Sequence, residues 1–280
     1  MNLLEFNTPS KIAIAFDEEA HRYTDEFNTK YTSVTTVIKD YEIPFDREYW
    51  LAWKAEKLQV SVEELDAVWV GINKDSLVRG NEKHNYLEGS IHALYANLKN
   101  TIKGFFYRGS KTLNREQLEQ SDLQFKHNKI YRFLVQLLNQ GYTLYPEYRV
   151  YNQQVGICGT IDVLAVKSKD FIIVDWKTNK DLLSFRAGYF KKDRNGIKTN
   201  KFVGKEEYFK YPLGDIEFCK GEIYTLQLSM YAFLTELFGL NCVGLYLWHI
   251  RDSDVMYEIK YRKQHIHKMI THHYKKKQTL

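Results

Sequence analysis

The chain has 280 residues and a mass of 33.3 kDa, which suits one large domain or two small ones. Hydrophobic residues make up 44% of it, and the formal net charge is +5, which excludes an intrinsically disordered chain. The mildly basic charge permits a polyanionic partner without requiring one. The three cysteines stand apart from one another, so neither a disulfide framework nor a four-cysteine zinc or iron–sulfur site fits.

No apolar run approaches the length of a membrane span, and the first residues lack the pattern of a signal peptide. We therefore expect a soluble, cytoplasmic protein with no membrane partner. The chain has four prolines and no Gly/Ser-rich stretch, so we see no flexible linker between domains. We expect a single domain with an N-terminal β-rich and helical extension at 1–75, a core at 76–260 and a basic helix at 261–280.

The first half of the chain predicts strands and then helices. Residues 10–38 indicate a β-rich opening, because KIAIAF alternates in polarity and YTSVTTVI is rich in β-branched residues. Residues 76–98 predict a helix with an apolar stripe at helical spacing. A second helix is predicted over KHNKIYRFLVQLLNQG, ending at Gly141.

The second half of the chain predicts the body of a sheet. YTLYPEYRVY, GTIDVLAV and FIIVDWKT are β-type runs separated by turns, and a long basic and aromatic insert follows at 181–221. YTLQLSMYAFLTELFG has a helical period, VGLYLWHI indicates a buried strand and VMYEIKYR an edge strand. The order of these elements predicts an α/β fold in which helices cover a mixed sheet.

One of these strands ends in a carboxylate and an ammonium group. Four apolar residues precede Asp175, which indicates a strand that is buried on both faces. Because side chains alternate along a strand, Asp175 and Lys177 are expected on one face and Trp176 on the other. An acid and a base at this spacing are common by chance, but at the end of a buried strand their charges need each other or a metal ion.

A second carboxylate precedes this strand. Asp162 is expected at the start of the preceding strand, so a hairpin between the two strands would bring Asp162 and Asp175 within a few ångströms. Two converging carboxylates form a hard-oxygen site suited to Mg²⁺ or Mn²⁺.

These residues stand in an order that resembles the PD-(D/E)XK nuclease superfamily, in its RecB-like and phage-exonuclease branch. That branch carries Gly-x-x-x-His on a helix, a Glu in a strand, Gly-x-x-Asp, Asp-x-Lys-Thr after apolar residues, and Gln-x-x-x-Tyr on a later helix. The matching residues here are Gly80–His84, Glu147, Gly159–Asp162, Asp175–Thr178 and Gln227–Tyr231. The opening, with His21-x-Tyr23 and Ser33-Val34-Thr35, looks like the start of phage members similar to the mitochondrial genome-maintenance exonuclease.

The resemblance implies a restriction-endonuclease-like core and a Mg²⁺- or Mn²⁺-dependent DNA exonuclease that leaves 5′-phosphates, acting in phage-type DNA replication, recombination or processing. It implies a metal held by Asp162, Asp175, the main-chain carbonyl of Trp176 and His84, with Lys177 as a catalytic residue. Glu147, Thr178, Gln227 and Tyr231 would support the site or contact DNA. Ile161 stands where the superfamily has proline, which leaves the carboxylate in place. The iron–sulfur relatives carry four cysteines, so no cluster is expected.

Several alternatives stay open. His84 and Glu147 could be an ordinary core histidine and a strand-surface charge, and Gln227 and Tyr231 could be ordinary helix packing. The 181–221 insert could bind DNA, single-stranded or at a duplex end, since cations follow phosphates and aromatic rings stack on bases, or it could be a solvated basic hairpin. The groove residues under the first reading are Lys191, Lys192, Arg194, Lys198 and Lys201.

The same residues also fit two functions other than an exonuclease. A structure-specific endonuclease or resolvase is an alternative within the nuclease class, and a non-catalytic DNA-binding module on the same scaffold is an alternative outside it. The stretch 104–112 evokes a phosphate-binding loop, but Ser110 displaces Lys111 from the required position and bulky aromatic residues fill the loop. No nucleotide cofactor is therefore expected.

Overall fold

A computed structural model describes residues 5–7, 9–10, 12–17, 22–72, 74, 127–179, 183–194, 197–250 and 254–279. The helix expected over 76–98, the Gly80–His84 motif, His21 and the loop at 104–112 lie outside these residues.

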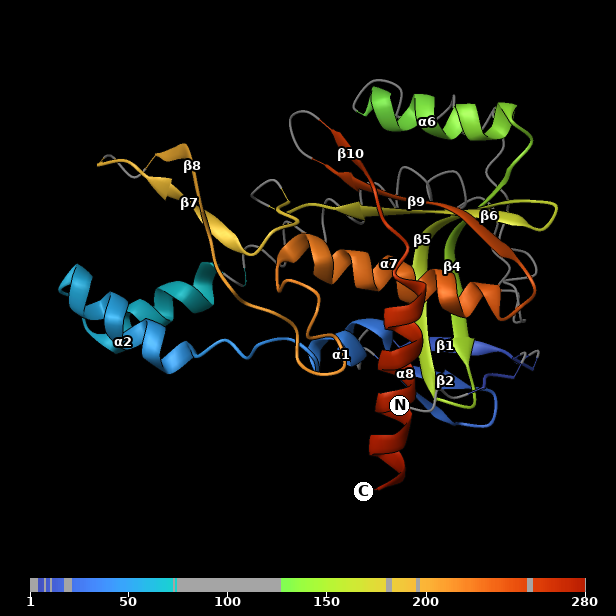
Figure 1. The fold of residues 1–280 in the computed structure, drawn as a ribbon, viewed down its shortest axis with the longest axis horizontal. Helices are drawn as coiled ribbons and strands as arrows, with labels where there is room; N and C mark the ends of the chain where they lie inside the picture. The colour runs from blue at the N-terminus through green and yellow to red at the C-terminus, as the bar shows by residue number, and fades with distance from the viewer. Residues whose placement is uncertain are drawn as a thin grey trace.

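The centre of the described part is one mixed sheet (Figure 1). Its strands run in the order β1, β2, β3, β5, β6, β9 and β10, and β4 also pairs with β5. The β3–β5 and β6–β9 pairs are parallel and the others are antiparallel. The strands are β1 (Ile14–Asp17), β2 (Arg22–Asp25), β3 (Lys30–Ser33), β4 (Thr143–Asn152), β5 (Ile157–Lys167), β6 (Asp170–Lys177), β9 (Asn241–His249) and β10 (Val255–Glu258).

Helices cover both faces of this sheet, as expected for the α/β class. In β6, Phe171 and Ile173 pack in the cluster formed with helix α7, whereas Ile172 and Val174 pack in the cluster formed with helix α6. Figure 1 shows α6 on one side of the sheet and α7 on the other. The covering helices are α1 (Val34–Lys39), α6 (Asn128–Asn139), α7 (Lys220–Glu236) and α8 (Lys263–Gln278).

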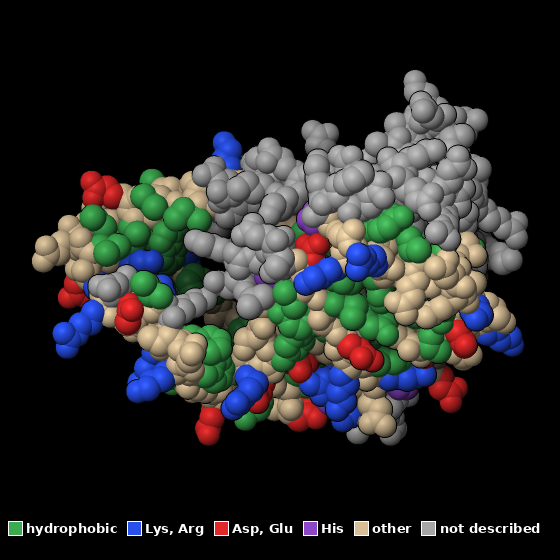
Figure 2. Space-filling view, turned by 90° about the horizontal axis from the view of Figure 1, so that it is seen from above, with side chains coloured by type: hydrophobic (Ala, Val, Ile, Leu, Met, Phe, Trp, Pro, Cys, Tyr) green, Lys and Arg blue, Asp and Glu red, His purple; other side chains and the backbone are tan. Residues whose placement is uncertain are grey.

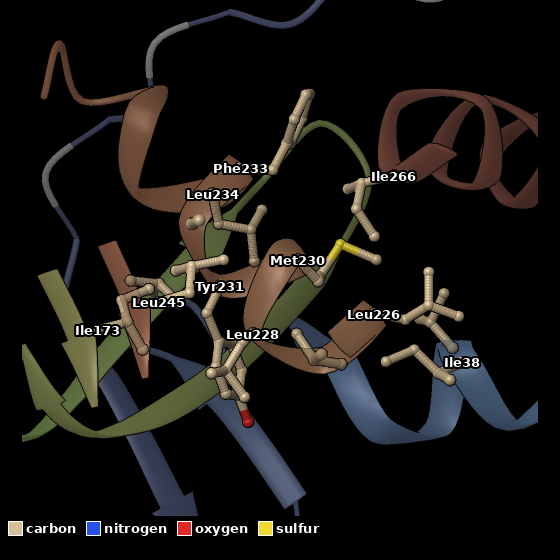
Figure 3. Close-up of a cluster of buried hydrophobic side chains, with 14 of the residues drawn as sticks. Ile38, Ile173, Leu226, Leu228, Met230, Tyr231, Phe233, Leu234, Leu245 and Ile266 are labelled. Atoms are coloured by element: carbon tan, nitrogen blue, oxygen red, sulfur yellow. The ribbon is translucent and has the colours of Figure 1, made fainter. Parts of the chain in front are cut away.

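Helix α7 is the centre of the larger core cluster. Every residue from Tyr224 to Thr235 is buried, so this helix is enclosed on all sides instead of presenting one apolar stripe. Figure 3 shows Met230 directed toward Ile266 of α8, and Leu226 toward Ile38 of α1. Burying a side chain of this size stabilises the fold by about 1.5–3 kcal/mol, so α7 holds the polar residues it carries at fixed positions.

The β-branched run YTSVTTVI is only partly a strand, so the strand prediction is wrong for its second half. A helix, α1, begins at Val34, and Ser33 caps it by accepting a hydrogen bond from the backbone N–H three residues on. Val34, Val37 and Ile38 are buried, which is the three-and-four spacing of a helix face. Composition favoured a strand, but the cap and this spacing decide the local structure.

The expected N-terminal extension is continuous with the central sheet. Strand β3 pairs in parallel with β5 through Thr32 and Ile157. The β-rich opening therefore extends the sheet on the side of β5, close to the first of the two carboxylates.

Two further units lie beyond one end of the sheet, at the left of Figure 1. Helix α2 (Arg47–Leu58) and a helical segment at 62–72 pack on each other through Leu51, Ala55 and Leu65. Strands β7 (Gly188–Lys192) and β8 (Lys198–Gly204) form a separate antiparallel hairpin, which we call the basic arm. Figure 2 shows hydrophobic side chains gathered over this end of the molecule. None of the described helices is both long and apolar enough to cross a membrane.

Candidate active site

The end of β6 carries a buried ion pair. Lys177 Nζ lies 2.5 Å from Asp175 Oδ2, and the Asp175 side chain is only 2% exposed. Trp176, between them, packs in the cluster on the α6 face. The alternation predicted from the sequence is therefore confirmed, and both charged groups lie on the α7 face of the sheet.

Asp162 accepts a hydrogen bond from the backbone near the end of β6. The β5–β6 ladder pairs Val163 with Val174, so its register sets Asp162 opposite Asp175. The backbone N–H of Trp176 donates a hydrogen bond to Asp162 Oδ2 at 2.7 Å. The Asp162 carboxylate thus takes the place of a main-chain carbonyl of β5 as the acceptor for this N–H, at the point where β6 separates from β5. Asp162 lies in the middle of β5, which begins at Ile157, so the prediction that it starts the strand is wrong.

Glu147 lies where the neighbouring β4–β5 ladder is interrupted. The pairs on either side are Pro146 with Val163 and Tyr148 with Ile161, and Glu147 itself has a φ of 48°. A left-handed φ is costly for a residue with a side chain, and such strain gathers at functional sites. Half-buried Glu147 therefore occupies the ladder position opposite Asp162.

Gln227 and Tyr231 of α7 complete the buried side of this site. Gln227 Nε2 donates a hydrogen bond to the Tyr231 hydroxyl at 2.9 Å, and both side chains are buried. Burial raises the pKa of Tyr231 well above its ordinary value, and the negative charge of Asp175 raises it further. The hydroxyl therefore stays protonated and can donate a hydrogen bond beside the carboxylates.

Lys177 keeps its charge in spite of its surroundings. Burial lowers the pKa of this side chain, but the charges of Asp175 and Asp162 outweigh that effect, so the pKa lies above its ordinary value. The ammonium group also lies 4.9 Å from the centre of the Tyr224 ring. The site thus sets the Lys177 cation against the carboxylates of Asp175 and Asp162.

The N-terminal strands contact β5 near the carboxylates. Tyr23 of β2 is buried and shares a hydrogen bond of 3.0 Å with Thr160 on β5. Burial raises the pKa of Tyr23, and the charge of Glu147 contributes to the same shift. Tyr23 therefore joins the N-terminal strands to β5 two residues before Asp162.

Asn179, which follows β6, and His249, which ends β9, carry no sequence signal for a role in the site. His249 Nε2 lies 2.7 Å from the carbonyl oxygen of Asn179, and the Tyr224 hydroxyl donates to Asn179 Oδ1 at 2.8 Å. His249 comes 70 positions after Asn179 in the chain, so only the parallel pairing of β6 with β9 brings them together.

The other predicted site residues directly follow β6, lie outside the described residues, or belong to the basic arm. Thr178 follows β6 and is partly buried, and His84 lies outside the described residues. The five predicted groove residues belong to the basic arm: two on β7, two on β8 and Arg194 in the turn between them. Figure 1 shows this hairpin projecting away from the sheet toward α2.

The donor set suits a divalent ion only in part. Asp162 and Asp175 offer the hard carboxylate oxygens that Mg²⁺ and Mn²⁺ prefer. Across the described ranges, no group of three or more His, Cys, Asp and Glu side chains gathers at metal-binding distance. An ion here would need further ligands beside these two carboxylates, such as main-chain carbonyls or water.

The chain matches no protein-family model, and no curated protein is significantly similar to it in sequence.

Proposed function

We propose that this chain is a divalent-metal-dependent deoxyribonuclease with a restriction-endonuclease-like core, acting as a DNA exonuclease. The observation that carries the proposal is the meeting of Asp162, Asp175 and Lys177 at one buried point, where β6 separates from β5. Two carboxylates and a cation within buried strands are costly for stability, so their presence together favours a chemical role.

The residues divide the work of phosphodiester hydrolysis between them. Mg²⁺ or Mn²⁺ would be held by Asp162, Asp175, the main-chain carbonyl of Trp176 and the imidazole of His84. Such an ion supplies Lewis acidity when bound. The Lys177 ammonium, held on Asp175, orients the attacking water and offsets the negative charge that develops on the phosphoryl oxygens. The protonated Tyr231 hydroxyl, fixed by Gln227, contacts a non-bridging phosphate oxygen.

The basic arm supplies the electrostatic side of DNA binding. Lys191, Lys192 and Lys201 are exposed on it, together with the aromatic residues Tyr189 and Phe190. Lysines neutralise phosphates, and exposed rings stack on unpaired bases. The arm is anchored near α7, because the N–H of Ala187 donates to Glu217 at its root and the N–H of Gly221 donates to the carbonyl of Ser184.

The direct test is cleavage of DNA labelled separately at each end, in the presence of Mg²⁺, Mn²⁺ or a chelator. An exonuclease gives a ladder of single-nucleotide steps from one end, dependent on the metal, with 5′-phosphate products. One discrete product would instead identify a structure-specific endonuclease. Binding without metal-stimulated cleavage would identify a non-catalytic DNA-binding module.

Matched variants locate the activity in the protein. Asp175→Asn and Lys177→Met should abolish cleavage, because each removes one charge from the site. Asp170→Asn is the control, since Asp170 begins the same strand at its opposite end and is exposed. Undiminished cleavage by Asp175→Asn would overturn the proposal.

A further inference from the structure

The chain leaves β6 at Lys177 and is held again only two residues later. Asn179 is gripped from two sides: its carbonyl oxygen lies 2.7 Å from His249 Nε2, and its side-chain oxygen accepts from the Tyr224 hydroxyl at 2.8 Å. One contact comes from β9 and the other from α7. The segment after the catalytic lysine is thus fixed between the sheet and the helix that covers it.

The chemistry of the histidine contact is determined by its partner. A carbonyl oxygen only accepts hydrogen bonds, so Nε2 of His249 is the donor and carries the proton. His249 is fully buried, and its other ring nitrogen, Nδ1, has no hydrogen-bond partner within the described part of the chain. Within the described part of the chain, the buried His249 ring therefore makes one hydrogen bond, to the main-chain carbonyl of Asn179.

Both contacts lead back to Lys177. In the β6–β9 pairing, Lys177 is opposite His249, and the N–H of Ile250 donates to the carbonyl oxygen of Lys177 at 2.8 Å. On the other side, the ring of Tyr224 lies 4.9 Å from Lys177 Nζ. The residues that hold Asn179 are therefore the same residues that border the lysine.

We propose that Asn179, clamped between His249 and Tyr224, is a positioning residue that fixes the Lys177 ammonium for catalysis. This inference rests on the proposed nuclease function and deepens it. In the contacts described above, Asn179 touches neither carboxylate, so it acts by holding the path of the chain after Lys177 and the position of the Tyr224 ring beside the ammonium group. A displacement of about 1 Å in a catalytic group lowers a rate on the order of a hundredfold, which sets the scale of the effect.

Steady-state kinetics on a labelled oligonucleotide tests the clamp through four variants. Asn179→Ala and His249→Leu should each lower kcat by about ten- to a hundredfold, and KM should stay within about twofold. His249→Gln keeps a side-chain N–H donor near the position of Nε2 and should recover kcat to within about threefold of the wild type. Asn152→Ala is the matched control, because Asn152 is a buried asparagine that accepts from the N–H of Val155 in a turn that joins β4 to β5.

A second measurement does not depend on activity. The Lys177 ammonium, identified by its loss in Lys177→Met, should give a slowly exchanging ¹⁵N–¹H NMR signal in the wild type, because it is buried and paired with Asp175. Asn179→Ala should shift or broaden that signal, and Asn152→Ala should leave it in place. A changed Lys177 signal in Asn179→Ala supports the clamp even if no DNA cleavage is found. Failure of the clamp can therefore be distinguished from failure of the proposed nuclease function.

Two results would overturn the clamp. One is that Asn179→Ala lowers the melting temperature as Asn152→Ala does, with kcat and the Lys177 signal unchanged. The other is that His249→Gln loses as much activity as His249→Leu, which would show that the Nε2 donor is not what matters.

Discussion

The ring of Tyr231 on α7 lies against the backbone of Gly159 on β5. A β-carbon at residue 159 would come within 2.5 Å of Tyr231 Cε1 and 3.1 Å of Val34 Cγ2. Ordinary carbon contacts are about 3.5–4.0 Å, so no side chain fits here while the ring stays in place. Two of the sequence motifs, Gly-x-x-Asp and Gln-x-x-x-Tyr, are therefore complementary in space: the glycine makes room for the tyrosine.

Gly159→Ala should lower the free energy of unfolding by about 1–3 kcal/mol, because the added methyl group must displace Tyr231 from a packed core. Gly159→Ala combined with Tyr231→Ala should cost less than the sum of the single changes, since the clash disappears with the ring. Urea unfolding of the four proteins measures this coupling. Gly71→Ala is the control: a β-carbon there meets nothing within 4 Å, so it should not destabilise. Additive costs for Gly159 and Tyr231 would refute the contact.

The strands, the later helices and the ion pair could be predicted because each leaves a local pattern. The apolar run before Asp175 and the two-residue spacing to Lys177 determine which face each side chain takes, and the hairpin determines that Asp162 returns beside them. The strand prediction failed at α1, where the N-cap at Ser33 overrides β-branched composition. The contact between His249 and Asn179 could not be predicted, because it depends on the pairing of strands far apart in the chain.

Removing Lys177 should destabilise the protein as well as inactivate it. Lys177→Met leaves Asp175 buried without its cation, which costs about 3–5 kcal/mol when a buried pair is broken from one side. Because the folded pKa of Lys177 is raised, this contribution is complete below the unfolded value of about 10.4 and is lost only as the pH rises through the folded pKa. Urea unfolding at neutral pH therefore measures all of it. Lys177→Met combined with Asp175→Asn should recover part of the loss, and a double variant less stable than either single variant would contradict the pairing.

Divalent ions should stabilise the folded protein through the carboxylates. An ion that binds only the folded state at a hundred times its Kd adds about 2.7 kcal/mol of stability, which is visible as a rise in Tm. Mg²⁺ and Mn²⁺ should therefore raise Tm in the wild type and in Asp170→Asn. Asp162→Asn and Asp175→Asn should lose the rise, because each removes one anionic ligand. A rise that survives both changes would place the ion elsewhere.

The charge of the basic arm should set DNA affinity without affecting the fold. Lys191 and Lys192 are exposed on β7, so Lys191→Glu with Lys192→Glu should leave Tm unchanged. Binding of a fluorescent oligonucleotide in chelator should weaken, and the slope of log K against log salt should become shallower by about two. Lys167→Glu with Lys169→Glu carries the same charge change at the turn between β5 and β6 and should keep wild-type binding. Equal losses in both pairs would indicate a general charge effect and not a binding arm.

The packing of α8 should make the protein sensitive to acid through His273. This side chain is buried, and desolvation lowers its pKa to about 4, an effect that the charge of Lys277 reinforces and that of Asp40 opposes. The unfolded chain takes up this proton near the ordinary histidine pKa of about 6.5, so stability falls as the pH drops from 6.5 toward 4. At pH 5 the loss from this one group is about 2 kcal/mol relative to neutral pH.

His273→Gln should remove that part of the loss of stability. His265→Gln, at a partly exposed position of the same helix, should keep it. Urea unfolding of the three proteins at pH 7.5 and pH 5 distinguishes these outcomes, and an undiminished acid loss in His273→Gln would assign the sensitivity to another group.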